Sequence, residues 1–224
     1  MPVTTGQLFK IMPIVINGSG TITGLSVGGL PDGTVDEDTL AASSVSATKH
    51  KPNAGSGAVI QVKSVSTSAT TQYGSTSSYT ESAWLDIAEL VVSITPTAST
   101  SKIHIAYNLM GEPSENEHRM RMRVKRAISG GATTYINAPA SSTRALTMGM
   151  MCQGYFDDQN NSTPGYFAMP SYVDSPSTTS AITYTVGYAM KHPNVTFRLN
   201  GTDDDDDNAD DERAISQITV MEIA

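Results

Sequence analysis

The sequence has one cysteine, few aromatic residues and no long apolar run. The single Cys152 excludes an intrachain disulfide, and the apolar run MGMMC around it indicates a buried thiol. No run approaches the roughly 20 apolar residues that span a bilayer, so we expect no membrane insertion. No segment has a convincing helical period. Ser, Thr, Gly and Ala dominate, and this composition favours strands and turns.

A charge excess is also missing from most of the chain. The 22 acidic and 14 basic residues give a net charge of −8, but the segment DDDDDNADDE, residues 203–212, holds eight of the acidic groups. The other 14 acidic residues balance the 14 basic ones. A general basic field is therefore absent, and we expect no nucleic-acid partner.

The sequence lacks the common catalytic and cofactor motifs. It contains no nucleophile elbow, phosphate-binding loop or dinucleotide fingerprint, and its four histidines are scattered without metal-ligand spacing. We therefore expect a protein that is not an enzyme, with no catalytic residue and no cofactor.

What the sequence does contain is period-two alternation from residue 58 onward. About ten segments, separated by Pro, Gly, Ser and Thr, predict a mainly β protein with an antiparallel β-sandwich body over residues 55–224. The segment ESAWLDIAEL is assigned to a strand. The clearest apolar sets are Leu90, Val92 and Ile94, and Ile103, Ile105, Tyr107 and Leu109.

The N-terminal part has a different character. Residues 1–26 contain the apolar segment FKIMPIVI, whose proline suits an edge strand or an extended arm. Residues 27–54 carry about one apolar residue in five, too few to offset an ordering cost of roughly 1–2 kcal/mol per residue. A threefold bundle would bring Val35, Leu40 and Val45 of three chains together on an axis. We therefore predict a short trimeric stem and a homotrimer.

Two stretches resemble bacteriophage fibre proteins. GTITGLSVGGLPDGTVDEDTLA is similar to their N-terminal and stem repeats, and VVSITPTASTSKIHI, residues 91–105, is similar to a segment in the C-terminal body of phage tail fibres, especially those of marine and cyanobacterial phages. The resemblance covers residues 18–107. It implies a homotrimer with a jelly-roll-like body, and an N-terminal arm that docks on another virion protein.

The expected function is accordingly that of a structural virion protein, made in the host cytoplasm. Only two stem repeats are present, which favours a short fibre, a neck or collar whisker, or a head-attached protein over a long fibre. The expected ligand is a host-surface glycan or lipopolysaccharide. One alternative is a capsid decoration or cement protein that stabilises the shell. A remote alternative is a glycan-cleaving enzyme of the tailspike type.

A row of basic residues marks the segment HRMRMRVKRA. Met120, Met122 and Val124 fall on one face of the predicted strand, and Arg119, Arg121, Arg123 and Lys125 fall on the other. Neighbours about 6–7 Å apart repel within a Debye length of about 8 Å unless anions oppose them. The partners left open are cross-strand Glu112, Glu115 or Glu117, carboxylates of a neighbouring subunit such as the 203–212 segment, and an anionic external ligand.

Two loops are candidate binding sites. Tyr155, Tyr166, Phe167 and Tyr172 bracket the polar segment FDDQNNSTPGYFAMPSYVDSPS and are candidate receptor contacts. Tyr184 and Tyr188 are assigned to the core or to the trimer seam. Asp203, Asp205 and Asp207 are weak calcium candidates, because the spacing of their segment departs from that of an EF-hand, and a solvated loop between two strands is the favoured interpretation.

Overall fold

The structure is a computed structural model, which describes residues 15–16, 22–23, 57–76, 83–114, 120–140, 142–144, 146–150, 170–190, 193–204, 206, 207, 209 and 211–224. The chain divides into two units, Met1–Lys51 and Pro52–Ala224. In the first, β1 (Val15–Ile16) pairs antiparallel with β2 (Ile22–Thr23). The predicted stem residues Val35, Leu40 and Val45 lie outside the described residues, so the trimeric stem stays a prediction.

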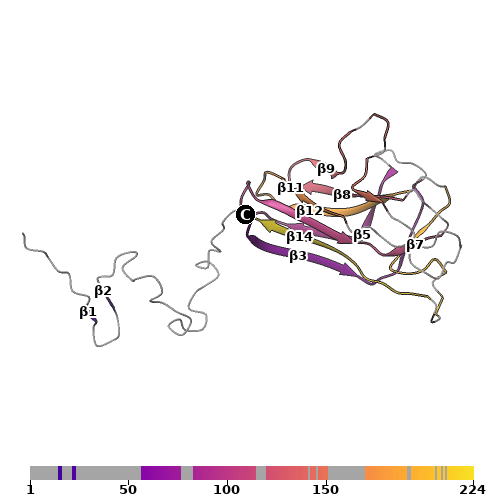
Figure 1. Ribbon diagram of the computed structural model, residues 1–224, viewed down its shortest axis with the longest axis horizontal. Helices are drawn as coiled ribbons and strands as arrows, with labels where there is room; N and C mark the ends of the chain where they lie inside the picture. Colours follow the sequence, from indigo (N-terminus) through magenta and orange to yellow (C-terminus); the bar gives the residue numbers. More distant parts are fainter. Residues whose placement is uncertain are drawn as a thin grey trace, which may run out of the picture. The chain divides into compact units, whose positions relative to one another are not determined.

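The second unit, the body, is an antiparallel β-sandwich (Figure 1), which confirms the expected mainly β fold. Sheet I has the strand order β11-β6-β14-β3, and sheet II has the order β10-β8-β12-β5, with β9 also paired to β8. The bounds in sheet I are β3 (Val59–Thr67), β6 (Lys102–Asn108), β11 (Ser171–Asp174) and β14 (Ser216–Ile223). Those in sheet II are β5 (Leu85–Ile94), β8 (Arg121–Ile128), β9 (Thr133–Ile136), β10 (Gly149–Met150) and β12 (Ile182–Ala189).

The connections between the sheets make this sandwich a jelly roll. Along the chain, β3, β6, β11 and β14 belong to sheet I, while β5, β8 and β12 between them belong to sheet II. The first long strand, β3, pairs with the last, β14, over eight registered positions from Ser216↔Thr67 to Ile223↔Val59. Two packed sheets whose long strands alternate along the chain in this way have the jelly-roll arrangement, here with four strands in sheet I and five in sheet II.

The core lies between the two sheets, on the faces that the sequence alternation predicted. Leu90, Val92 and Ile94 of β5 are buried, as are Ile103, Ile105 and Tyr107 of β6 and the Leu109 that follows it. Tyr184 and Tyr188 of β12 are fully buried in the same core. Each such side chain contributes roughly 1.5–3 kcal/mol by leaving water, so the body has a core of its own.

The two ends of the body differ. The body begins at residues 57 and 58, which pair with residue 224. Gly57 N donates to Ala224 O at 2.9 Å, and Ala224 N donates to Ala58 O at 2.9 Å. At this proximal end the short connections 95–101 and 175–181 join the two sheets, and the short connection 129–132 joins β8 to β9 within sheet II. The long connections 68–84, 109–120, 137–170 and 190–215 all leave from the opposite, distal end. Figure 1 shows the C-terminus at one end of the sheets and β7 at the other.

A buried carboxylate organises the proximal end. Glu222 of β14 is fully buried and accepts hydrogen bonds from Gln61 Nε2 at 2.6 Å, from Thr97 N and Oγ1 at 2.7 Å each, and from Ser101 Oγ at 2.7 Å. Burial by itself would raise the pKa of Glu222, but these donors outweigh it and hold the pKa below the ordinary value. The 95–101 turn is thereby fixed to the last strand.

A third sheet covers the distal end. Sheet III has the order β4-β13-β7, with β4 (Thr71–Tyr73), β7 (Gly111–Pro113) and β13 (Phe197–Leu199) each taken from a different long connection. Tyr188 attaches it to the sandwich: its ring centroid lies 5.8 Å from that of Tyr73 and 5.9 Å from that of Phe197, and its hydroxyl donates to Gly74 O at 2.6 Å. Sheet III is therefore packed firmly against the distal end of the sandwich.

Candidate binding pocket at the distal half of the sandwich

A pocket of about 450 Å³ opens between the edges of the two sheets. Its lining comes from the end of β9, the two arms of the hairpin that follows β9, and the start of β11. The lining residues are Ile136, Asn137, Ala138, Pro139, Thr147, Met148, Ser171 and Tyr172. This volume lies within the usual range for small-ligand sites.

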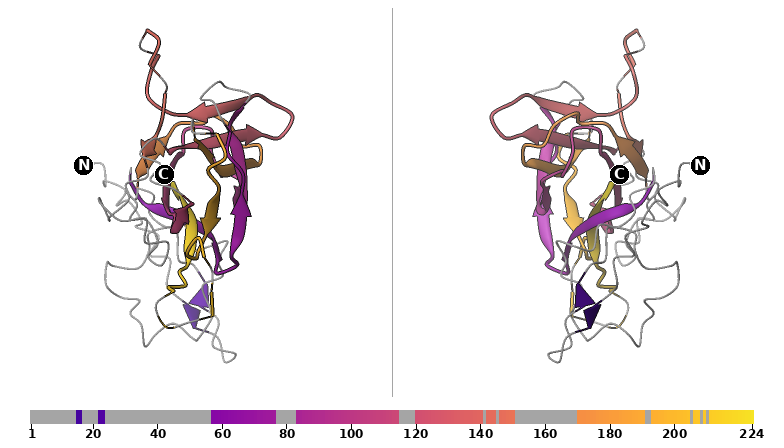
Figure 2. Two further views of the ribbon diagram at one scale, coloured as in Figure 1. Left: turned by 90° about the vertical axis from the view of Figure 1, so that its right-hand side faces the viewer. Right: turned by 90° about the vertical axis from the view of Figure 1, so that its left-hand side faces the viewer.

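The 137–148 hairpin forms one wall of the pocket. Its base is closed by a hydrogen bond from Ala138 N to Thr147 O at 3.1 Å, and Thr147 Oγ1 donates to Met122 O on β8 at 2.8 Å. Figure 2 shows this hairpin standing away from the sheets. The described residues near its tip are exposed, and Ser142 there has a positive φ of 51°. The hairpin therefore presents surface beside the pocket.

Tyr172 is the only predicted receptor contact that the described residues include. Its side chain is 48 % exposed at the pocket, and the residue belongs to β11, whereas the sequence analysis assigned it to a loop. The difference arises because β11 is a four-residue edge strand flanked by Pro170 and Ser175-Pro176, too short to show alternation. Tyr155, Tyr166 and Phe167 lie outside the described residues.

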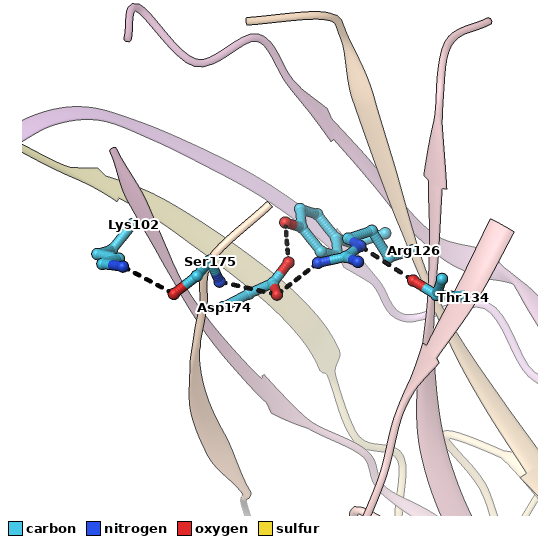
Figure 3. A network of polar contacts seen from close by, with 6 residues as sticks. Lys102, Arg126, Thr134, Asp174 and Ser175 are labelled. Carbon is cyan, nitrogen blue, oxygen red and sulfur yellow. Dashed lines mark hydrogen bonds and ion pairs between the residues drawn. The ribbon is translucent and has the colours of Figure 1, made fainter. Parts of the chain in front are cut away.

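An ion-pair network holds β11 against sheet II next to the pocket (Figure 3). Asp174 accepts from Arg126 Nη1 at 2.7 Å on one carboxylate oxygen and from the Tyr184 hydroxyl at 2.8 Å on the other. Arg126 also donates through Nε to Thr134 Oγ1 at 3.0 Å, and Ser175 N donates to Asp174 at 2.9 Å. Asp174 is 5 % exposed. We call this network the Asp174 latch, because it joins the edge strand of sheet I to β8, β9 and β12 of sheet II.

The structure describes part of the predicted basic row, whereas Arg119, Glu115 and Glu117 lie outside the described residues. Met120, Met122 and Val124 face the core as predicted. On the other face, the Arg123 guanidinium carbon lies 4.4 Å from the Trp84 ring centroid and 3.6 Å from that of Tyr135, with the side chain only 3 % exposed. Such contacts between a cation and aromatic rings are favourable.

These contacts bear on the expected intersubunit role of the row. Arg123 has an intrachain environment, and Lys125 forms an ion pair with Asp86 of β5. Arg121 is partly exposed, and Arg119 lies outside the described residues. The predicted interface role of Arg119, Arg121 and Arg123 stays a prediction. Of the carboxylates suggested as partners, Glu112 lies in sheet III, against the 203–212 segment, because β7 pairs with β13 and not with β8.

Glu112 forms the centre of an acidic cluster at the distal end. The residue is 1 % exposed, and its carboxylate accepts from Asp203 N at 2.8 Å. The pKa of Glu112 is raised to about 7. Burial is the largest cause, the hydrogen bond from Asp203 N opposes it, and repulsion from Asp203, Asp204 and Glu212 adds to it. Opposite Glu112 on β13 is Arg198, whose Nε donates to Asp203 O at 3.2 Å.

Of the weak calcium candidates, only Asp203 is shown to belong to this cluster. Asp203 is partly buried beside Glu112, Asp207 is exposed, and Asp205 lies outside the described residues. Within the described part of the chain, no three His, Cys, Asp or Glu side chains are placed together to hold a metal ion. The carboxylates of Asp203, Asp204 and Glu212 instead repel the buried carboxylate of Glu112.

The raised pKa of Glu112 predicts a pH-dependent stability. The folded state holds the proton more tightly than the unfolded chain, whose pKa is near 4.5, so the stabilisation is complete below that value and is lost as pH rises through about 7. We expect the melting temperature to fall between pH 5 and pH 8, for a loss of at most about 3 kcal/mol. Glu112→Gln keeps an acceptor for Asp203 N and should flatten this slope. An unchanged slope would place the titration elsewhere, and Asp203, whose pKa is also raised, is then tested with Asp203→Asn.

The comparisons with known proteins give no family. No protein-family model matches the chain, and no curated protein matches it significantly. Among the described residues, no helix has the length and apolarity needed to cross a membrane.

Sequence reasoning found one lining residue of the pocket, Tyr172, and missed the others. Asn137, Thr147 and Ser171 are ordinary polar residues of turn-rich segments, and nothing local distinguishes them. The latch was missed for a related reason. Asp174 and Arg126 are 48 residues apart, and only the jelly-roll connection brings β11 to β8.

Proposed function

We propose that the chain is a non-enzymatic structural appendage of a bacteriophage virion, a trimeric fibre anchored through residues 1–26 whose body contacts the host surface. The observation that carries this proposal is the polarity of the body. The chain comes in at the proximal end among short turns, while the long connections, sheet III and the 137–148 hairpin belong to the distal half.

This polarity suits an attachment protein. A body held through the segment that precedes Gly57 is held at its proximal end, which leaves the distal connections free to meet another surface. Loops on a rigid scaffold are where binding residues concentrate. Three bodies per trimer and several trimers per particle would raise avidity through effective concentration, even when each contact is weak. The resemblance of residues 18–107 to phage fibres supports the same function.

The location on the virion tests the proposal. Electron microscopy of particles labelled with antibodies against the body should place the label on projecting appendages of the tail, neck or head. Label spread evenly over the shell, together with capsids that lose heat resistance when the protein is removed, would instead establish the decoration protein. Release of sugar from host polysaccharide by the purified protein would establish the enzyme.

The predicted stem gives a second test. Native mass spectrometry of the full chain should find three copies of 23.7 kDa, and Leu40→Asp combined with Val45→Asp should shift the population to single chains, because charges cannot share a closed axis. Thr39→Asp is the control, since Thr39 is outside the predicted axial set. A single chain at micromolar concentration in the unaltered protein would contradict the trimer.

A further inference from the structure

The pocket exists because the two sheets are closed along one side and only partly along the other. On the β3–β5 side, Gln61 Nε2 of β3 donates to Thr95 O just after β5 at 2.7 Å. On the other side, the Asp174 latch joins the sheets near the proximal end. Distal to the latch, β9 ends at Ile136 and β11 starts at Ser171, and the pocket occupies the space that remains.

The pocket lining combines apolar surface with neutral polar groups. Ile136, Ala138, Pro139 and Met148 supply aliphatic surface, and Tyr172 adds a half-exposed aromatic ring. The hydroxyl of Thr147 is engaged with the backbone, since it donates to Met122 O and accepts from Gly149 N at 3.1 Å.

Three other polar side chains at the pocket remain available. Those of Asn137, Ser171 and Tyr172 make no hydrogen bond to other residues that the structure describes, so their donors and acceptors can serve a ligand. Together they offer one amide and two hydroxyls around an aliphatic and aromatic floor.

The charge of the lining restricts the ligand. None of the described lining residues is ionised at neutral pH, and the nearby Arg126 and Asp174 are paired with each other. An anionic ligand would lose its hydration without gaining a cation, which is costly in a partly enclosed site. The lining therefore favours a neutral ligand that has both a C–H face and several hydroxyl groups.

We propose that this pocket binds a neutral saccharide, with the Tyr172 ring against the apolar face of a sugar ring and the Asn137 and Ser171 side chains bonded to its hydroxyls. The proposal rests on the proposed attachment function and names the ligand class for it. An aromatic side chain provides a large, rigid surface together with one polar group, which matches the two-sided character of a pyranose. The Asp174 latch is two residues from Tyr172 on the same short strand and holds that ring at the pocket.

Saturation-transfer NMR with the full chain tests this directly. The neutral probes are glucose, galactose, mannose, rhamnose and N-acetylglucosamine. The charged probes are glucuronic acid, N-acetylneuraminic acid and inorganic phosphate as competitor. At least one neutral sugar should bind with a millimolar dissociation constant, as expected for a ligand of this size. Phosphate should not displace it, and the acidic sugars should bind more weakly.

Variants assign the binding to the pocket. Tyr172→Ala should raise the dissociation constant by about tenfold or more, and Tyr172→Phe, which keeps the ring, should stay within about threefold. Val62→Ala is the matched control, because Val62 is 52 % exposed on β3, at the opposite edge of sheet I. Melting temperatures of all three variants show that the body remains folded.

Three results would overturn the proposal: no neutral sugar binds, an acidic sugar binds best, or Tyr172→Ala binds as well as the unaltered protein. None of these three results would contradict the appendage proposal, which is tested separately by the position of the protein on the virion and by the mass of its assembly. Conversely, label on the shell alone would remove the appendage function while leaving sugar binding to be decided by the NMR result.

Discussion

Asp174→Ala should destabilise the body by about 3–5 kcal/mol. The substitution leaves the Arg126 charge without its carboxylate in a site where that side chain is only 19 % exposed, and it leaves the buried Tyr184 hydroxyl without its acceptor. Removing one partner of a buried pair costs more than the pair contributes, because the remaining charge stays desolvated. Denaturant unfolding followed by circular dichroism measures the loss.

Two further variants separate the latch from a general effect of charge removal. Asp174→Asn keeps an oxygen for Tyr184 and should lose less than Asp174→Ala. Asp86→Ala removes the partner of Lys125 from an exposed pair, 44 % exposed on the aspartate side, and should cost about 1 kcal/mol or less. If Asp174→Ala costs no more than Asp86→Ala, the latch does not hold the sandwich edge together.

Gly111→Ala should also destabilise the body, with an expected loss of about 3 kcal/mol. A Cβ at Gly111 would lie 2.2 Å from the Arg198 carbonyl oxygen and 2.8 Å from two ring atoms of Phe197. The first of these is backbone in the paired strand β13, so the ladder itself must move, and Phe197 is fully buried in the core. Thermal unfolding measures the effect on the body.

The same variant has a second consequence. Because β7 carries Glu112, displacement of this strand should also reduce the pH dependence of stability between pH 5 and pH 8. Gly74→Ala is the matched control, since a Cβ there would meet nothing within 4 Å, and it should leave both quantities unchanged. Equal melting temperatures for the two alanine variants would show that β7 is not packed against β13 as the geometry requires.

The sandwich was predictable from the sequence because its long strands have one buried face. In β6, residues 103, 105 and 107 are apolar and buried, while 102, 104, 106 and 108 are not fully buried. The same rule identified β5 through Leu90, Val92 and Ile94, and it also identified β8 and β14. The segment ESAWLDIAEL, assigned to a strand, is strand only from Leu85 onward: Ala83 and Trp84 precede β5, and residues 81 and 82 lie outside the described residues. Alternation of apolar and polar residues indicates that one face of a strand is buried. This pattern can be read from a few consecutive residues without knowledge of the fold.

The candidate site was much less predictable. The short strands β4, β7 and β11 have three or four residues, too few for a period. They are strands because distant segments pair with them: β11 pairs with β6, and β4 and β7 pair with the equally short β13. The buried polar residues Arg123, Asp174, Glu112 and Glu222 look like surface residues in the sequence. Their burial depends on partners that only the jelly-roll connection supplies. The pocket is likewise a gap between distant segments.

The position of β14 in sheet I has a consequence for biosynthesis. β3 and β6 do not pair with each other, since β14 lies between them and pairs with both. While a ribosome is still making residues 216–223, sheet I therefore cannot assemble, and the apolar faces of β3, β5 and β6 stay uncovered on the nascent chain. Folding of the body should therefore be completed only after β14 has left the ribosome, although every other strand of the two sheets is made before it.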